Sequence, residues 1–83
     1  MKVVIDKKAI KEINSLGKDS ANRIYNFLSE LEHCDPRSKD KAFKGKLKEL
    51  WRYRVGSYRI LSEIQDEVLV VLVVRVNHRS KIY

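Results

Sequence analysis

Apolar positions in the first 36 residues follow a strand pattern and then two helical patterns. Val3 to Ile5 read as a short strand. Asp6 is a good helix N-cap, because its side-chain oxygen can accept the free amide hydrogens of a first turn. Two apolar stripes at helical spacing follow, separated by Gly17 as a stop signal. The stripes are Ala9, Ile10, Ile13, Leu16 and then Ala21, Ile24, Phe27, Leu28, Leu31. We expect a helix hairpin whose second helix begins near residues 19–20 and ends by residues 35–36.

The second half of the chain carries three strand signals: Leu50 to Val55, Tyr58 to Ile64, and Val68 to Val76. The first two segments have the alternation that is typical of β-strands. The last segment is apolar on both faces, as expected of a central strand. Gly56-Ser57 and Gln65-Asp66 provide the tight connections between the strands.

Residues 37–49 have no clear period, and we expect a basic loop anchored by Phe43 and Leu47. No repeat, linker or low-complexity tract divides the sequence. We predict one domain, residues 1–83, of the α+β class. Its order is a strand, a two-helix hairpin and a three-stranded antiparallel meander, with the first strand added to the same sheet (βααβββ).

Positive charge is concentrated in one part of the chain. Eighteen Lys and Arg face eleven Asp and Glu, for a net charge of +7. Between Arg37 and Arg59 lie nine basic and two acidic residues, so this segment alone carries +7 and the rest is neutral. A concentrated positive charge favours a polyanionic partner, either nucleic acid or an acidic protein.

Cysteine usage and apolar run lengths favour the cytoplasm. Cys34 is the single cysteine, so no internal disulfide can form, which fits a reducing compartment. The start of the chain has no apolar stretch long enough for a signal peptide. The longest apolar run, Val68 to Val74, is far shorter than the roughly 20 residues of a membrane helix. We therefore expect no membrane association.

Arginines converge on the predicted hairpin. If Gly56-Ser57 is a two-residue turn, Arg54 lies opposite Arg59, and Arg52 shares their face. Like charges opposite each other destabilise a sheet, whereas a phosphate would relieve the repulsion because arginine binds its oxygens bidentately. The prediction depends on the register, and a three-residue turn would break it.

The end of the last strand and the residues that follow it can extend this basic surface. They include Arg75, His78, Arg79, Lys81 and Tyr83, and we expect them to reach the same face. Other chemistry is poorly supported. No His/Cys cluster has metal-ligand spacing, no glycine-rich phosphate loop exists, and Cys34 has no evident base.

Several of these segments together resemble the RelE/ParE toxin superfamily. The resemblance rests on the basic approach Lys44-Gly45-Lys46-Leu47, the hairpin from Leu50 to Ile60, the apolar strand and the ending from Arg75 to Tyr83. It implies a small RelE-like fold and a toxin of a type II toxin–antitoxin system. RelE-type members enter the ribosomal A site and cut messenger RNA there, by attack of a ribose 2′-hydroxyl on the neighbouring phosphate. The reaction needs no metal or other cofactor.

The resemblance also implies roles for individual residues. Arg59 matches the arginine that grips the scissile phosphate, Arg79 the second arginine that stabilises charge or protonates the leaving group, and Tyr83 the tyrosine that stacks on the nucleotide. Arg52 and Arg54 stand where better-studied members have a lysine pair, so the obvious base candidate is missing. RNA contacts are expected from Lys44, Lys46, Lys48, Arg75, His78 and Lys81. His78 has the best intrinsic pKa for proton transfer.

The expected partners are the ribosome, its messenger RNA and a RelB-like antitoxin, acidic and helical, which wraps the toxin. Two alternatives stay open on the same fold. One is a ParE-like toxin that inhibits DNA gyrase, and the other is an inactive antitoxin-binding homologue.

Overall fold

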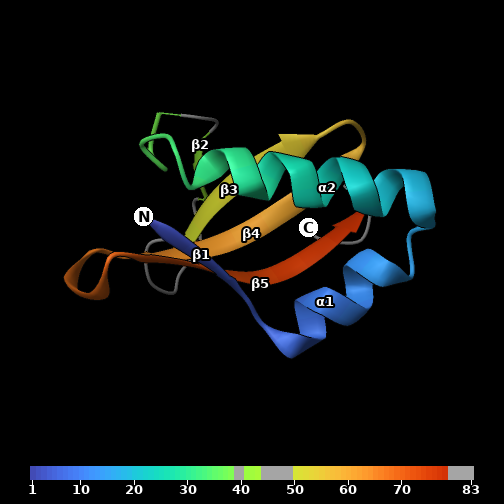
Figure 1. The fold of residues 1–83 in the computed structure, drawn as a ribbon, viewed down its shortest axis with the longest axis horizontal. Coiled ribbons are helices and arrows are strands. Elements are labelled where there is room, and N and C mark those ends of the chain that lie inside the picture. Colours follow the sequence, from blue (N-terminus) through green and yellow to red (C-terminus); the bar gives the residue numbers. More distant parts are fainter. Residues whose placement is uncertain (39–40, 44–49, 79–83) are drawn as a thin grey trace.

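The computed structural model describes residues 1–38, 41–43 and 50–78, and in 41–43 only the backbone. Its elements follow the predicted order, with one added strand and a short 3-10 helix (Figure 1). They are β1 (Lys2–Ile5), α1 (Lys7–Asn14), α2 (Lys18–Leu31), β2 (Lys41–Phe43), β3 (Leu50–Val55), β4 (Tyr58–Gln65), the 3-10 helix η1 (Asp66–Val68) and β5 (Val70–His78). The predicted α+β fold is confirmed.

Helix boundaries agree with the sequence signals to within a few residues. The Asp6 side chain caps α1 by accepting the Lys8 N–H at 3.3 Å. Gly17 has φ +95°, a conformation that L side chains rarely adopt, and it lets the chain reverse between the helices. α2 begins one residue after it, at Lys18, slightly earlier than expected.

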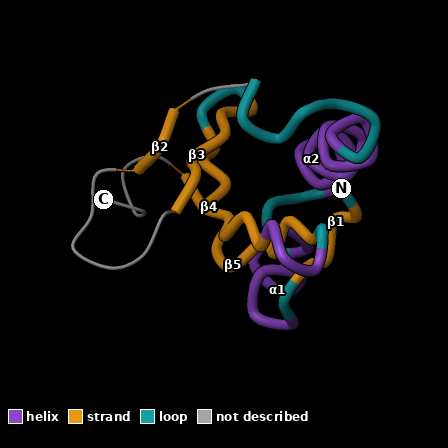
Figure 2. Tube along the Cα trace, turned by 90° about the vertical axis from the view of Figure 1, so that its left-hand side faces the viewer, coloured by secondary structure: helices purple, strands orange, loops and turns teal. Residues whose placement is uncertain are grey.

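All five strands form one mixed sheet, in the order β1-β5-β4-β3-β2. β1 is parallel to β5, and the chain between these two strands runs through both helices and the other three strands. The other neighbours are antiparallel. Figure 2 shows α1 and α2 on the same side of the sheet, so the other side is left without a helix.

The hydrophobic core lies between the helices and this covered side of the sheet. Both apolar stripes face it, together with alternate residues of the three long strands, except that Ile10 of the first stripe is 37% exposed. Its fully buried members include Ala9, Ile13, Ile24, Tyr53, Ile60, Val71, Val73 and Val76. The Tyr53 hydroxyl donates a buried hydrogen bond of 2.6 Å to the Pro36 carbonyl, which fixes the segment after α2 to the sheet. None of the helices in the described ranges is long and apolar enough to cross a membrane.

Two sequence predictions about the strands were wrong. Residues 41–43 of the expected loop form the edge strand β2, whose three residues pair with β3. The connection after β4 is also longer than two residues, because Asp66–Val68 form a 3-10 turn and Leu69 has φ +55°. β5 therefore begins at Val70 rather than Val68. The predicted anchoring by Phe43 and Leu47 lies outside the described side chains.

A β-bulge in β5 changes which side chains share a face. Leu61 lies opposite Arg75, but Ser62 lies opposite Val73, so Val74 is an extra residue on β5. The extra residue lets Val71, Val73 and Val76 all point into the core although their spacing changes from two to three.

Candidate functional site

The β3–β4 hairpin places two arginines side by side. Val55 pairs with Tyr58 and Arg54 with Arg59, so Gly56-Ser57 is the predicted two-residue turn and the expected register is confirmed. Gly56 has φ +59°, which favours glycine at this position of the turn.

The arginines occupy the sheet face that the helices leave uncovered. Tyr53 and Ile60, which alternate with them, are fully buried on the helix side. Side chains alternate along a strand, so Arg52, Arg54 and Arg59 share the opposite face. Arg54 is exposed, whereas Arg52 and Arg59 are half-buried. These three arginines, together with Asn77 of β5, are called the arginine face.

Arg59 is held in place by its own backbone neighbourhood. Its Nη1 donates to the Tyr58 carbonyl at 3.1 Å and to the Gly56 carbonyl at 3.3 Å. Its Nε is buried and has no hydrogen-bond partner in the described part of the chain. A buried donor without a partner costs about 1–3 kcal/mol. The two contacts with its own turn fix the orientation of the Arg59 guanidinium.

Asn77 lies opposite Arg59 on β5, and the sequence analysis assigned it no role. The bulge at Val74 explains why, since counting in steps of two along an unbroken strand puts Asn77 on the wrong side. The Asn77 side chain accepts the His78 N–H through Oδ1 at 2.8 Å. Its amide can face the same ligand as Arg59.

His78 is separated from the arginines by the sheet. It lies opposite Tyr58, and the two rings meet edge to face with centroids 6.0 Å apart. Tyr58 packs against the core, and its hydroxyl accepts from Ser20 of α2 at 3.4 Å. The expectation that His78 reaches the arginine face is therefore wrong, because alternation turns its side chain to the helix side.

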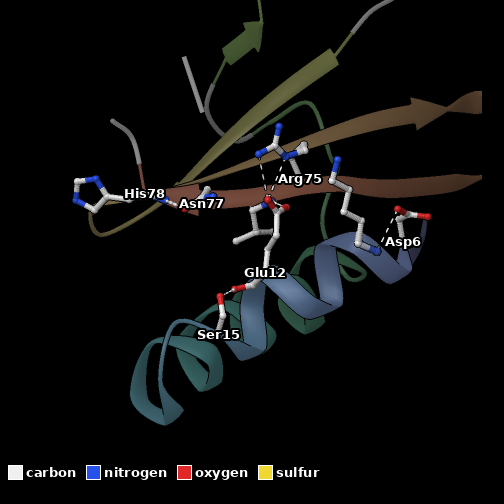
Figure 3. A network of polar contacts seen from close by, with 8 residues as sticks. Asp6, Glu12, Ser15, Arg75, Asn77 and His78 are labelled. Carbon is white, nitrogen blue, oxygen red and sulfur yellow. Dashed lines mark hydrogen bonds and ion pairs between the residues drawn. The ribbon is translucent and has the colours of Figure 1, made fainter. Parts of the chain in front are cut away.

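Arg75 is engaged within the protein. Its Nε donates to Glu12 Oε2 at 3.1 Å, and the ion pair joins β5 to α1 (Figure 3). This partner offsets the charge that was expected to contact RNA. The remaining candidates lie outside the described residues: Lys44, Lys46, Lys48, Arg79, Lys81 and Tyr83.

Metal and thiol chemistry find little support in the described ranges. They contain no group of three or more His, Cys, Asp or Glu residues that could hold a metal ion. Cys34 is a half-buried free thiol in the turn after α2. The site is best described as three arginines on the sheet face that the helices do not cover, with Arg59 held by its own turn, an arrangement suited to phosphate.

Comparison with protein families shows to which family the chain belongs. Residues 3–83 match the family model described as ParE toxin of type II toxin-antitoxin system, parDE. The chain belongs to this ParE toxin family. The resemblance to the RelE/ParE superfamily is thereby confirmed. Comparison with curated proteins gives no match.

Solved structures similar to this ParE-family chain include RelE toxins and their complexes with RelB. A chain of the RelBE2 toxin–antitoxin complex from Mycobacterium tuberculosis is 26% identical, with a TM-score of 0.84 over 94% of this chain and 96% of the other. The isolated Escherichia coli RelE toxin is 26% identical, with a TM-score of 0.77 over 99% and 89%. A chain of the archaeal RelE–RelB complex from Pyrococcus horikoshii is 25% identical, with a TM-score of 0.74 over 96% of each chain.

Proposed function

We propose that this protein is a toxin that cleaves messenger RNA in the ribosomal A site. The observation that carries the proposal is the opposed pair Arg54 and Arg59 on the sheet face that the helices do not cover. The contacts of Arg59 with the Gly56 and Tyr58 carbonyls hold one of these guanidinium groups in a fixed orientation. The similarity to RelE toxins in fold and length supports the same reading.

In the proposed reaction the ribose 2′-hydroxyl attacks the neighbouring phosphate and the 5′-oxygen leaves. Negative charge grows on the phosphate oxygens, and preorganised cations stabilise it. Arg59 grips the phosphate, and Arg54 and Arg52 add positive charge beside it. By family resemblance, Arg79 assists the leaving group and Tyr83 stacks on the nucleotide, which is worth about 1–3 kcal/mol per base.

Proton transfer is not assigned to the described part of the arginine face. A guanidinium stays protonated at ordinary pH, and the Asn77 amide does not titrate. His78 lies on the helix side of the sheet, away from the arginine face. We propose that these residues act by electrostatics and positioning, and that no cofactor takes part.

The proposed partner is a helical, acidic antitoxin that covers the arginine face. Solved complexes pair RelE with RelB in Pyrococcus horikoshii and in Methanococcus jannaschii. A concentrated basic surface would attract an acidic protein as well as RNA, so toxin and antitoxin binding would compete. Both the ribosome and the antitoxin would be met in the cytoplasm.

Inhibition of DNA gyrase is the second candidate, because the matching family model is named for ParE. One paired assay separates the two. The purified protein is added to programmed ribosomes, with primer extension to detect cut messenger, and in parallel to gyrase, with a supercoiling and DNA-break readout. The proposal expects cleavage in the A site and no effect on gyrase. Trapped DNA breaks with intact messenger would replace it by the gyrase function, and inactivity in both assays would leave an antitoxin-binding homologue.

A further inference from the structure

Glu12 connects α1 to the second half of β5 through its carboxylate. Oε1 accepts the Val76 N–H at 2.9 Å, and Oε2 accepts from Arg75 Nε at 3.1 Å and lies 3.1 Å from Arg75 Nη2 (Figure 3). The Glu12 side chain is only 16% exposed. One carboxylate thus holds both a backbone amide and a side chain on the same strand.

The strand needs this contact because its neighbour ends early. β1 pairs with β5 only as far as Ile5 opposite Val73, and Asp6 then starts α1. Among the described residues, no strand pairs with this edge of β5 beyond Val73. The bulge at Val74 interrupts the ladder at the same place. An edge amide left unpaired costs stability and invites other strands, and the Glu12 carboxylate occupies it.

Glu12 is itself well anchored. Ala9 and Ile13, which flank it on the same side of α1, are fully buried against the sheet. The Glu12 carbonyl accepts the Ser15 hydroxyl at 2.8 Å in the last turn of the helix. A group on a rigid element can hold another group in a fixed position.

The Val76 backbone, which Glu12 binds, is adjacent in sequence to Asn77 of the arginine face. Val76 lies opposite Ile60, and the next residue, Asn77, lies opposite Arg59. A shift of the Val76 backbone would therefore move Asn77 relative to Arg59. We infer that Glu12 is a positioning residue, which fixes the end of β5 beside Arg59 and so sets the geometry of phosphate binding. This inference rests on the proposed function.

The test compares Glu12→Ala, which removes both contacts, with Glu12→Gln, whose amide oxygen can still accept the Val76 N–H. Lys11→Ala on the same helix is the control. Single-turnover cleavage is measured at saturating ribosomes, below the melting temperature of every variant. Glu12→Ala should lose on the order of 10-fold to 100-fold in rate, the scale expected from a small misplacement of a catalytic group. Its ribosome affinity should stay unchanged, and Glu12→Gln and Lys11→Ala should keep most of the rate.

Amide hydrogen exchange and backbone NMR shifts supply a readout that does not need cleavage. In Glu12→Ala, the Val76 amide should exchange faster and the Asn77 and Arg59 amides should shift, whereas Glu12→Gln should preserve them. A folded Glu12→Ala protein that cleaves at the wild-type rate would overturn the inference. Equal losses of cleavage rate in Glu12→Ala and Glu12→Gln would also overturn it, if the Val76 amide stays protected from exchange in Glu12→Gln. A wild-type protein that never cleaves would end the proposed function, but unchanged Asn77 and Arg59 signals would be needed to end this inference as well.

Discussion

Arg54 and Arg59 lie directly opposite each other on β3 and β4, on the sheet face that the helices do not cover. Two like charges in this arrangement oppose the pairing of their strands. The repulsion is relieved when an anion binds between them. The same pair should therefore reduce stability in the free protein and increase affinity for phosphate.

Arg54→Glu tests the cost of this pair. The change replaces a like-charge pair with an opposite-charge pair, so the free energy of unfolding should rise, by up to about 1 kcal/mol at low salt. Cleavage should fall because the anion site loses one cation and gains a carboxylate. Urea unfolding at low and high salt gives the measurement. The gain should disappear in an Arg59→Ala background, and a gain of equal size there would show that the pair is not its origin.

Tyr53→Phe tests the link between the sheet and the segment after α2. The hydroxyl donates to the Pro36 carbonyl in a buried setting, so its loss leaves a buried acceptor unsatisfied and should cost about 1–3 kcal/mol. Tyr58→Phe is the matched control, because its hydroxyl makes only a part-buried contact of 3.4 Å with Ser20. Chemical denaturation should give Tyr53→Phe a clearly lower free energy of unfolding than Tyr58→Phe. Equal stabilities would contradict the buried bond.

The stability of the protein should depend on pH through an ion pair at the β4–β5 connection. Arg37 donates two hydrogen bonds to the Asp66 carboxylate, at 2.9 and 2.8 Å, and holds the pKa of Asp66 below its ordinary value of 3.8. A lowered pKa gives stability that is present above pH 3.8 and is lost as the pH falls through the lower, folded-state value.

Asp66→Asn should therefore reduce the melting temperature slightly at neutral pH. The effect is small because the pair is solvent-exposed. The difference from wild type should shrink as the pH is lowered below 3.8. Glu67→Gln, an exposed neighbour, should show no such pattern. If the melting temperature of Asp66→Asn fell further below that of the wild type at low pH, the stabilising role of the Arg37–Asp66 ion pair would be contradicted.

The sequence predicted the helices and the hairpin because their signals are local. Asp6 and Gly17 mark the helix ends, and the alternation around Gly56 fixes the register that pairs Arg54 with Arg59. The edge strand β2 could not be predicted, since it is three residues long and its segment has no alternation.

The parts of the site that sequence reasoning missed depend on non-local geometry. The bulge at Val74 has no signature in a run of valines, yet it decides that Asn77 lies opposite Arg59. The pairing of Tyr58 with His78 places the histidine on the helix side. Glu12 and Arg75 are 63 residues apart, and only the folded chain brings them together.

The central claim is that Arg59 stabilises the transition state of RNA cleavage. Single-turnover cleavage of messenger on programmed ribosomes by Arg59→Ala, with a thermal melt alongside, tests it most directly. Arg23→Ala is the matched control, because that exposed guanidinium lies against the same turn, 3.4 Å from where a Gly56 Cβ would stand, but comes from α2. We predict a folded Arg59→Ala protein with a rate lower by on the order of 10²–10³, partial rescue by lysine, and near-normal cleavage by Arg23→Ala. Full cleavage by folded Arg59→Ala would contradict the claim.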